Sequence, residues 1–236
     1  MDTTSGASHR FIEMKHDWDY ERPILARYID PLELIWLSCC RELKLHIRRD
    51  PDIFSMTDGT GLLALGPRSD LDPDDTLCQM VFHEICHWIT NGVETYYERD
   101  WGFEVGAELD HREHACQRLQ AALSDPHGLR DVMAPTGIFR QYYDQIPADP
   151  FQKIPGDDAW EDTVVDMAKQ AFERAQNPPF AEVLQRSLRA TAQMRELIQP
   201  FLSHYQTEEA SDELSSWWAT NRVWRSLLES SENDAT

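Results

Sequence analysis

The spacing of apolar residues predicts a mostly helical chain that contains one small sheet. From Pro31 to Ile47, apolar residues recur at helical spacing behind a proline at a plausible first helical position. Two short apolar runs then flank the turn-rich segment 58–61 within residues 52–66. This pattern is typical of a β-hairpin. We therefore expect a helix followed by a small antiparallel sheet.

A second predicted helix has a start signal at its N-terminal end and a stop signal at its C-terminal end. Residues 72–75, Asp-Pro-Asp-Asp, supply an N-cap, a proline and two acids for the positive end of the helix dipole. Asn91-Gly92 supplies a C-terminal stop, so the helix should end at about Thr90. One face carries an apolar stripe of Cys78, Val81, Phe82, Ile85 and Ile89. His83 and His87 lie off the centre of this stripe, so we expect them to face a cleft.

The rest of the chain predicts further helices around one proline-rich connection. A third helix is expected from about Phe103 to Leu123, with Pro126 just beyond it. The segment 131–157 carries four prolines and has room for one short helix, IFRQYYDQI. Helical patterns then cover 158–176, 179–205 and 212–230. The predicted organisation is an irregular arm at 1–30, a core at 31–150 and a helical C-terminal part at 151–236.

Charge and composition exclude several classes of protein. Lys and Arg total 22 against 42 Asp and Glu, and this net charge of -20 repels nucleic acid. We find neither an export signal at the N-terminus nor an apolar run of about 18 residues, so we expect no membrane span. The five cysteines include no C-x-x-C pair, which favours buried, reduced thiols over a disulfide framework or an iron–sulfur cluster. The composition predicts a soluble cytoplasmic protein.

The sequence HEICH, residues 83–87, contains the clearest pattern of metal-ligating and acid–base residues in the chain. Two histidines four residues apart project from one face of a helix, so both imidazoles can reach one zinc ion. Zinc lowers the pKa of a bound water towards about 7, and a neighbouring carboxylate can then take the proton of that water. His83 and His87 are therefore the predicted zinc ligands, and Glu84 is the predicted general base of peptide hydrolysis.

Two other interpretations of HEICH remain open at the level of sequence. His83 and His87 could be ordinary histidines on a partly buried helix, with Glu84 a surface acid. The metal could also be iron or manganese, because two histidines and a carboxylate suit non-haem iron. The capped amphipathic helix, the hairpin before it and the acid-bearing helix after it favour zinc.

Catalytic zinc needs a third protein ligand, and two acids on the third predicted helix compete for this role. On a helical projection Glu113 lies at the edge of the apolar side, from which a side chain can cross to a neighbouring helix. Glu108 lies inside the apolar side, and an inward-pointing acid is a serious rival. The helical angles alone leave both residues open.

The segment from about residue 53 to residue 126 resembles the gluzincin metallopeptidases, and within them the short cytoplasmic group typified by ImmA and IrrE proteins. In that group HExxH follows a small hairpin, and a second helix carries E-x-x-A-N-x-F-A with a proline beyond it. Here EHACQRLQAALSDP has Glu113 at the first position, Cys116, Gln117 and Leu119 in place of Ala, Asn and Phe, and Pro126 beyond them. The resemblance implies a zincin-like core, with Glu113 as the third ligand beside His83 and His87 and with Glu84 as the general base.

The sequence thus predicts an α+β, mostly helical protein with a zincin-like core, a small antiparallel sheet and a helical C-terminal extension. The expected function is zinc-dependent hydrolysis of a protein or peptide, and the expected cofactor is Zn²⁺. The alternative is a zinc-binding regulatory or scaffold protein without proteolysis, which would recognise a partner through its C-terminal tryptophans. A donor for the developing oxyanion is expected among five residues of the following segment: His127, Arg130, Arg140, Tyr142 and Tyr143. Substrate and oligomeric state stay open.

Overall fold

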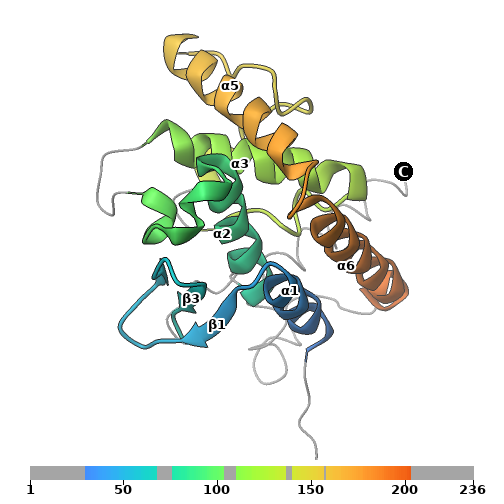
Figure 1. Cartoon of the computed structure of the whole chain (residues 1–236). Helices are drawn as coiled ribbons and strands as arrows, with labels where there is room; N and C mark the ends of the chain where they lie inside the picture. The colour runs from blue at the N-terminus through green and yellow to red at the C-terminus, as the bar shows by residue number, and fades with distance from the viewer. Residues whose placement is uncertain (1–29, 68–75, 104–109, 137–139, 157, 203–236) are drawn as a thin grey trace, which may run out of the picture.

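The computed structural model describes residues 30–67, 76–103, 110–136, 140–156 and 158–202 (Figure 1). Within these ranges the protein is α+β and mostly helical, as predicted, with one three-stranded sheet. The N-terminal arm predicted for residues 1–30, except Asp30, and the helix predicted at 212–230 lie outside the described residues. The class is therefore confirmed, whereas the zincin-like identity of the core stays a prediction.

Helix α1, Pro31–Glu42, is shorter than its apolar pattern predicts. The Asp30 side chain caps its N-terminus by accepting hydrogen bonds from the backbone N–H groups of Leu32 and Glu33. Just beyond the helix, Lys44 adopts a left-handed backbone conformation with φ 65°, which a continuing helix does not allow. The predicted extension to Ile47 is therefore wrong, and strand β1, His46–Arg49, occupies that stretch.

The sheet is mixed rather than antiparallel, with strand order β1-β3-β2. Strands β2, Ser55–Thr57, and β3, Leu62–Leu65, form the predicted hairpin. Gly59 in the turn has φ 72°, and a Cβ there would lie 2.6 Å from the carbonyl oxygen of Tyr97. Strand β1 pairs parallel to β3. The prediction of a purely antiparallel sheet missed this strand because its residues continue the apolar spacing of α1.

Helix α2, Leu77–Asn91, carries HEICH through the centre of the fold (Figure 1). Thr76 is its N-cap, and Gly92 ends it with φ 115°, at the stop that the sequence predicts. The capping residues predicted at 72–75 lie outside the described residues. The predicted apolar stripe is buried, and twelve of the fifteen helical residues are buried in all. The three that reach the surface are His83, Glu84 and Asn91.

The third helix begins later than predicted. After the 3-10 turns η2, Val93–Tyr97, and η3, Asp100–Gly102, the backbone at Phe103 is extended. Helix α3 is His111–Ser124, and the Asp110 side chain caps it. It is followed by η4, Asp125–His127, and by the short helix α4, Arg140–Tyr143, inside the predicted connection.

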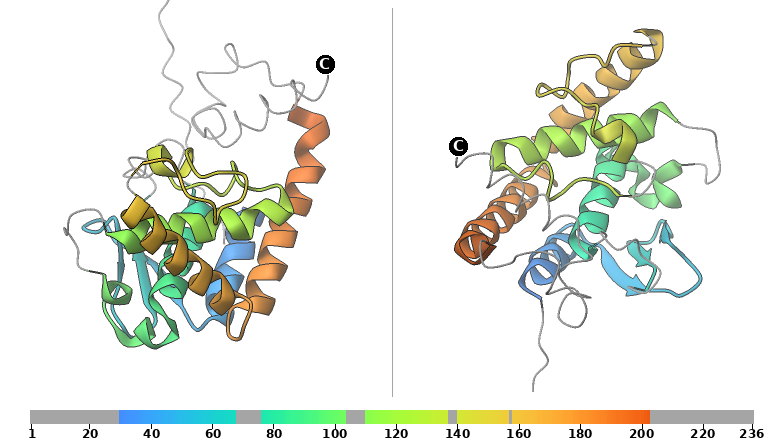
Figure 2. Two further views of the ribbon diagram at one scale, coloured as in Figure 1. Left: turned by 90° about the horizontal axis from the view of Figure 1, so that it is seen from above. Right: turned by 180° about the vertical axis from the view of Figure 1, so that it is seen from behind.

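Helices α5, Asp158–Ala175, and α6, Ala181–Leu202, form where the sequence predicts them. Helix α5 lies across α3, and α6 runs beside α1 (Figures 1 and 2). One hydrophobic core joins α1, α2 and α3 to α5 and α6, through residues such as Trp36, Phe82, Leu119, Ala171 and Leu188. The boundary predicted after residue 150 stays a prediction. Within the described ranges, no helix is both apolar and long enough to cross a bilayer.

Candidate metal centre

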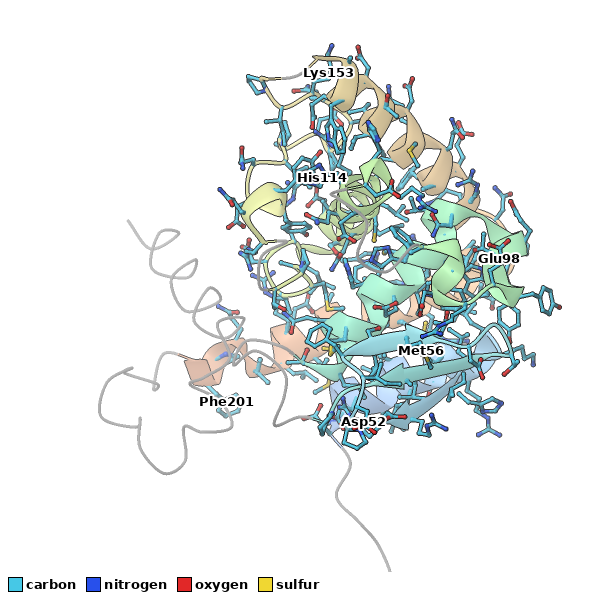
Figure 3. All side chains as sticks on the ribbon, turned by 90° about the vertical axis from the view of Figure 1, so that its left-hand side faces the viewer. Asp52, Met56, Glu98, His114, Lys153 and Phe201 are labelled. Atoms are coloured by element: carbon cyan, nitrogen blue, oxygen red, sulfur yellow. The ribbon has the colours of Figure 1, made fainter. Side chains whose placement is uncertain are left out.

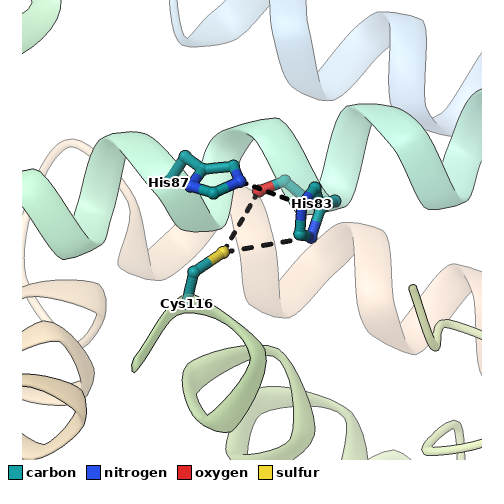
Figure 4. Close-up of side chains that lie close together, drawn as sticks. All are labelled: His83, His87 and Cys116. Carbon is teal, nitrogen blue, oxygen red and sulfur yellow. Dashed lines mark hydrogen bonds between the residues drawn. The ribbon is translucent and has the colours of Figure 1, made fainter. Parts of the chain in front are cut away.

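His83 and His87 face each other one turn apart on α2, as their spacing predicts. Their Nε2 atoms are 2.9 Å apart, and the two rings meet edge to face. His87 is buried, whereas His83 and Glu84 are partly exposed. Figure 4 shows the two imidazoles above α3, which passes beneath α2. The helix thus presents two nitrogen ligands at one point.

Glu113 joins the histidines from the first turn of α3. One carboxylate oxygen, Oε2, lies 3.2 Å from Nε2 of His87, and Oε1 lies 3.6 Å from Nε2 of His83. The Gln117 side chain, one turn further along α3, donates from Nε2 to Oε1 at 3.0 Å. Glu113 itself is buried. The predicted third ligand therefore meets the other two, while its rival Glu108 lies outside the described residues.

The proximity of Glu113 and the two histidines changes their acid–base properties. Burial alone would raise the pKa of Glu113, but His87 and His83 outweigh burial and hold the pKa well below its usual range. Burial alone would lower the pKa of His87, but the Glu113 carboxylate outweighs burial and raises it. The cluster therefore holds an ionised carboxylate beside two imidazoles, and this negative charge favours a positive charge next to it, either a proton on His87 or a metal ion.

The donor atoms of this cluster fit a zinc ion. Bonds of about 2.0 to 2.1 Å in a tetrahedral arrangement place two ligand atoms roughly 3.3 Å apart. The two Nε2 atoms are 2.9 Å apart, and the two Glu113 oxygens lie 3.2 and 3.6 Å from one histidine each, so these separations bracket that value. In addition, Nδ1 of His87 is buried and has no hydrogen-bond partner among the described residues. This nitrogen lies across the imidazole ring from Nε2, so it is not one of the donor atoms of the cluster.

Cys116 is a second candidate for the third ligand. From the sequence alone it is interpreted as a core residue. Its Sγ lies 3.9 Å from Nδ1 of His83 and 3.6 Å from the His83 carbonyl oxygen (Figure 4). One ligand atom from each of His83, His87 and Cys116 falls within 4.8 Å of the others. Burial raises the pKa of the Cys116 thiol well above its usual value, so ligation would require that proton to leave. All five cysteines are buried and free of disulfides, as predicted.

Glu84, the predicted general base, is oriented by the sheet. Ser55 on β2 donates from Oγ to Oε1 of Glu84 at 2.6 Å. A hairpin directly before the helix predicts that sheet and helix are neighbours, but it does not predict which strand residue reaches Glu84. Ser55 is therefore a site residue that the sequence did not identify.

Aromatic packing closes the other side of His87. The Phe103 ring meets the His87 ring edge to face, with centroids 4.5 Å apart. Arg112 lies over the Phe103 ring at 4.6 Å and donates from Nη1 to the Gly102 carbonyl oxygen at 2.9 Å. This packing covers His87 on one side. Solvent therefore approaches the cluster from the side of His83 and Glu84, which are partly exposed.

The predicted cleft beside the two histidines and the predicted oxyanion donors stay predictions. A cavity of about 430 Å³ lies elsewhere, between η2 and the end of α5, lined by residues such as Val93, Gln170 and Arg174.

The candidates for the oxyanion donor make hydrogen bonds and ion pairs within the connecting segment or near it. For example, the Tyr142 hydroxyl bonds Arg118 and Glu161, and the Tyr143 hydroxyl donates to the carbonyl oxygen of Arg130. Arg130 and Arg140 pair with Asp125 and Asp144.

Comparison of the chain with models of protein families, with curated proteins and with solved structures finds no match. The resemblance to the gluzincin metallopeptidases therefore depends only on the residues of HEICH and of the segment that follows Glu113.

Proposed function

We propose that this protein is a zinc-dependent metallopeptidase whose metal is held by His83, His87 and Glu113. The observation that carries the proposal is the convergence of two imidazole nitrogens and the Glu113 carboxylate, each of whose oxygens faces one histidine, beside a partly exposed glutamate. The residues that converge are the two histidines of the HExxH pattern and the acid that the resemblance to the gluzincins implies as third ligand.

Glu84 supplies the proton transfer that peptide hydrolysis requires. A zinc ion in this site would act as a Lewis acid, lowering the pKa of water and polarising a peptide carbonyl. Glu84 accepts the proton that the attacking water loses and passes it to the departing amine. Ser55 holds one carboxylate oxygen, Oε1, so that the other oxygen is available for this transfer.

The outer edge of β2 at Ser55 supports an extended peptide as the substrate, whereas Asp100 and Arg99 already contact this edge at Thr57 and Asp58. A hydrogen bond from Gly66 N–H to the Phe54 carbonyl oxygen pairs Phe54 with β3, so by alternation Ser55 and Thr57 turn their backbone groups outward. In agreement, Thr57 N–H donates to Asp100 rather than to β3. Among the described strands β2 is an edge strand, and an added peptide strand would pass Ser55 next to Glu84.

The decisive experiment separates metal binding from catalysis. Glu84→Gln is expected to keep one zinc per chain, measured by mass spectrometry, and to lower turnover of an unfolded generic protein substrate by roughly 10²- to 10⁴-fold. Glu94→Gln, an exposed acid beyond the end of α2, is the matched control and should leave both quantities unchanged. Undiminished turnover in Glu84→Gln, or wild-type protein without zinc, would overturn the proposal.

Cys116 favours a second candidate, a zinc-binding protein without proteolytic activity. Catalytic zinc sites keep one position open, whereas four protein ligands make a closed structural site. If Cys116 joins His83, His87 and Glu113, the site is closed. Cobalt-substituted protein distinguishes the two, because a thiolate ligand produces a charge-transfer absorption band. A band that is lost in Cys116→Ser and kept in Cys78→Ser, together with loss of zinc in Glu113→Gln, would favour the second candidate, and absence of the band from the wild type would favour the peptidase.

A further inference from the structure

Gln120, one helical turn beyond Cys116 on α3, contacts the opposite side of the His83 ring from the metal centre. Its Oε1 lies 3.0 Å from Nδ1 of His83. The Gln120 side chain is completely buried. We infer that Gln120 is a positioning residue that holds His83 in the one tautomer able to offer Nε2 to the metal, an inference that depends on the proposed metal centre.

A second hydrogen bond fixes which end of the Gln120 amide faces the histidine. The amide nitrogen Nε2 lies 2.5 Å from the carbonyl oxygen of Met133. A backbone carbonyl can only accept a hydrogen bond, so the nitrogen of the amide must point towards Met133. The amide oxygen then faces His83. The segment around Met133, which is buried in the core, thereby sets the orientation of Gln120.

The orientation of Gln120 determines the tautomer of His83. An amide oxygen can only accept, so Nδ1 of His83 must carry the hydrogen and donate it. A neutral imidazole with its hydrogen on Nδ1 has its lone pair on Nε2. That nitrogen is the atom that faces His87 and Glu113. His83 is therefore held in the tautomer that can bind a metal through Nε2, even when no metal is present.

His87, the other candidate ligand, has no described residue in the position that Gln120 takes behind His83. Its Nδ1 is buried and is not hydrogen-bonded by any described residue. The two ligand histidines thus differ, because one is fixed from behind and the other is not. Partners behind metal-bound histidines typically change metal affinity by about 10- to 100-fold, so the contribution of Gln120 is measurable.

The structure offers a matched control for a substitution at Gln120. Gln79 on α2 is also buried, and its Nε2 donates to the carbonyl oxygen of Ala134, the residue after Met133. Its side chain hydrogen-bonds the same connecting segment and Thr76 at the start of α2, rather than a ring nitrogen of either histidine. Gln→Met keeps the length of either side chain and removes both polar atoms. Any general effect of losing a buried amide should therefore appear in both variants.

The first measurement is zinc affinity, by competition with a chromogenic chelator. Gln120→Met is expected to weaken binding by about 10- to 100-fold, whereas Gln79→Met should bind zinc as the wild type does. Gln120→Glu should retain affinity close to the wild type, because the introduced carboxylic acid can accept from His83 and, when protonated, donate to Met133. Equal losses in Gln120→Met and Gln79→Met, or no loss in either, would overturn the inference.

The second measurement reads the tautomer directly. In zinc-loaded protein labelled with ¹⁵N-histidine, the Nδ1–H resonance of His83 should be observed in the wild type and in Gln79→Met, and should be lost or displaced in Gln120→Met. A resonance that does not change in Gln120→Met would contradict the positioning role. A wild type that binds no zinc would instead overturn the metal centre itself, and retained zinc without hydrolysis would overturn only the peptidase.

Discussion

The carboxylate of Glu113 faces both imidazoles of the candidate metal centre, and it raises the pKa of His87 against the effect of burial. His83, Glu84 and His87 could be placed on one helix from sequence, since their spacing fixes their relative directions. Ser55, Cys116 and Gln120 could not be assigned to the site in this way. Each comes from another element, and its contact depends on how strand β2 or helix α3 packs against α2.

Glu113→Gln should therefore remove more of the metal affinity than any change at Cys116. The substitution leaves an amide, which is a poor zinc ligand, where the carboxylate lies between the histidines. We expect zinc affinity to fall by more than the roughly 10- to 100-fold typical of residues behind the ligands, and Cys116→Ala to keep one zinc per chain. Metal analysis after dialysis measures both. Zinc lost from Cys116→Ala and kept by Glu113→Gln would reassign the third ligand to Cys116.

His114, the residue after Glu113, provides a test of pH dependence on the side of α3 that contacts Trp160 of α5 (Figure 3). Its Nδ1 accepts a hydrogen bond from Trp160 at 3.1 Å, its ring stacks on Tyr142, and burial lowers its pKa. A His pKa that is lower in the folded state than its unfolded value of about 6.5 stabilises the fold above that value and loses the stabilisation as pH falls through the folded pKa.

We therefore expect the free energy of unfolding of wild type to approach that of His114→Gln as pH falls below about 6.5. Above neutral pH the difference between the two proteins should be constant. Denaturant unfolding in the presence of a chelator measures it, because the chelator removes the pH dependence of metal binding. A difference that grows as the pH falls would show that His114 is charged in the folded state.

At the scale of elements, caps and turns decided where the sequence succeeded and where it failed. The stop at Gly92 was predicted because glycine adopts positive φ readily, and the structure has φ 115° there. The end of α1 was missed because Lys44, an ordinary helix former, adopts the left-handed conformation. The start of α3 was missed because the pattern from Phe103 onward does not reveal that Asp110 is the cap.

Gly92→Ala should destabilise the protein by about 1 to 3 kcal/mol, because a residue with a Cβ is strained at this backbone conformation. The new Cβ would also lie 2.5 Å from the Glu94 carboxylate, but that side chain is exposed and can move. Adding Glu94→Ala should accordingly restore little stability. Thermal unfolding of both variants is the measurement, and full recovery in the double variant would assign the loss to the collision instead.

The whole molecule is held together across its predicted parts by more than apolar contacts. The buried Arg118 on α3 pairs with Glu161 on α5 and donates to the carbonyl oxygens of Pro150 and Gln152. It also donates to the Tyr142 hydroxyl at 2.7 Å. The sequence predicted each of these elements but not this pairing, since nothing in the spacing of Arg118 and Glu161 relates two helices separated by a proline-rich connection.

Arg118→Met should destabilise the protein by about 3 to 5 kcal/mol, because it leaves the Glu161 carboxylate buried without its cation. Arg118→Met combined with Glu161→Gln should be more stable than Arg118→Met alone, because no unpaired charge remains. Chemical denaturation of the two proteins gives the comparison. Equal stability of the single and the double variant would mean that lost packing, rather than the unpaired charge, causes the effect.

Removal of metal should leave this architecture intact, because the core that joins α1, α2, α3, α5 and α6 is apolar. Ligand at 100 times its dissociation constant adds about 2.7 kcal/mol of stability, so chelation should lower Tm by several degrees without loss of helical circular dichroism. Collapse of the circular dichroism signal on chelation would instead indicate a fold built on the ion, as in zinc fingers.

The burial of twelve of the fifteen residues of α2 has a consequence for the life of the protein in a cell. Quality-control proteases degrade chains in proportion to the time that those chains spend open. A helix held on nearly every side by the rest of the core should keep the metal-free chain folded, although that chain opens more often than the loaded one by the stability that the metal adds. In the proposed metallopeptidase, the metal-free chain should therefore persist as a dormant pool, and activity should return with the metal without new synthesis.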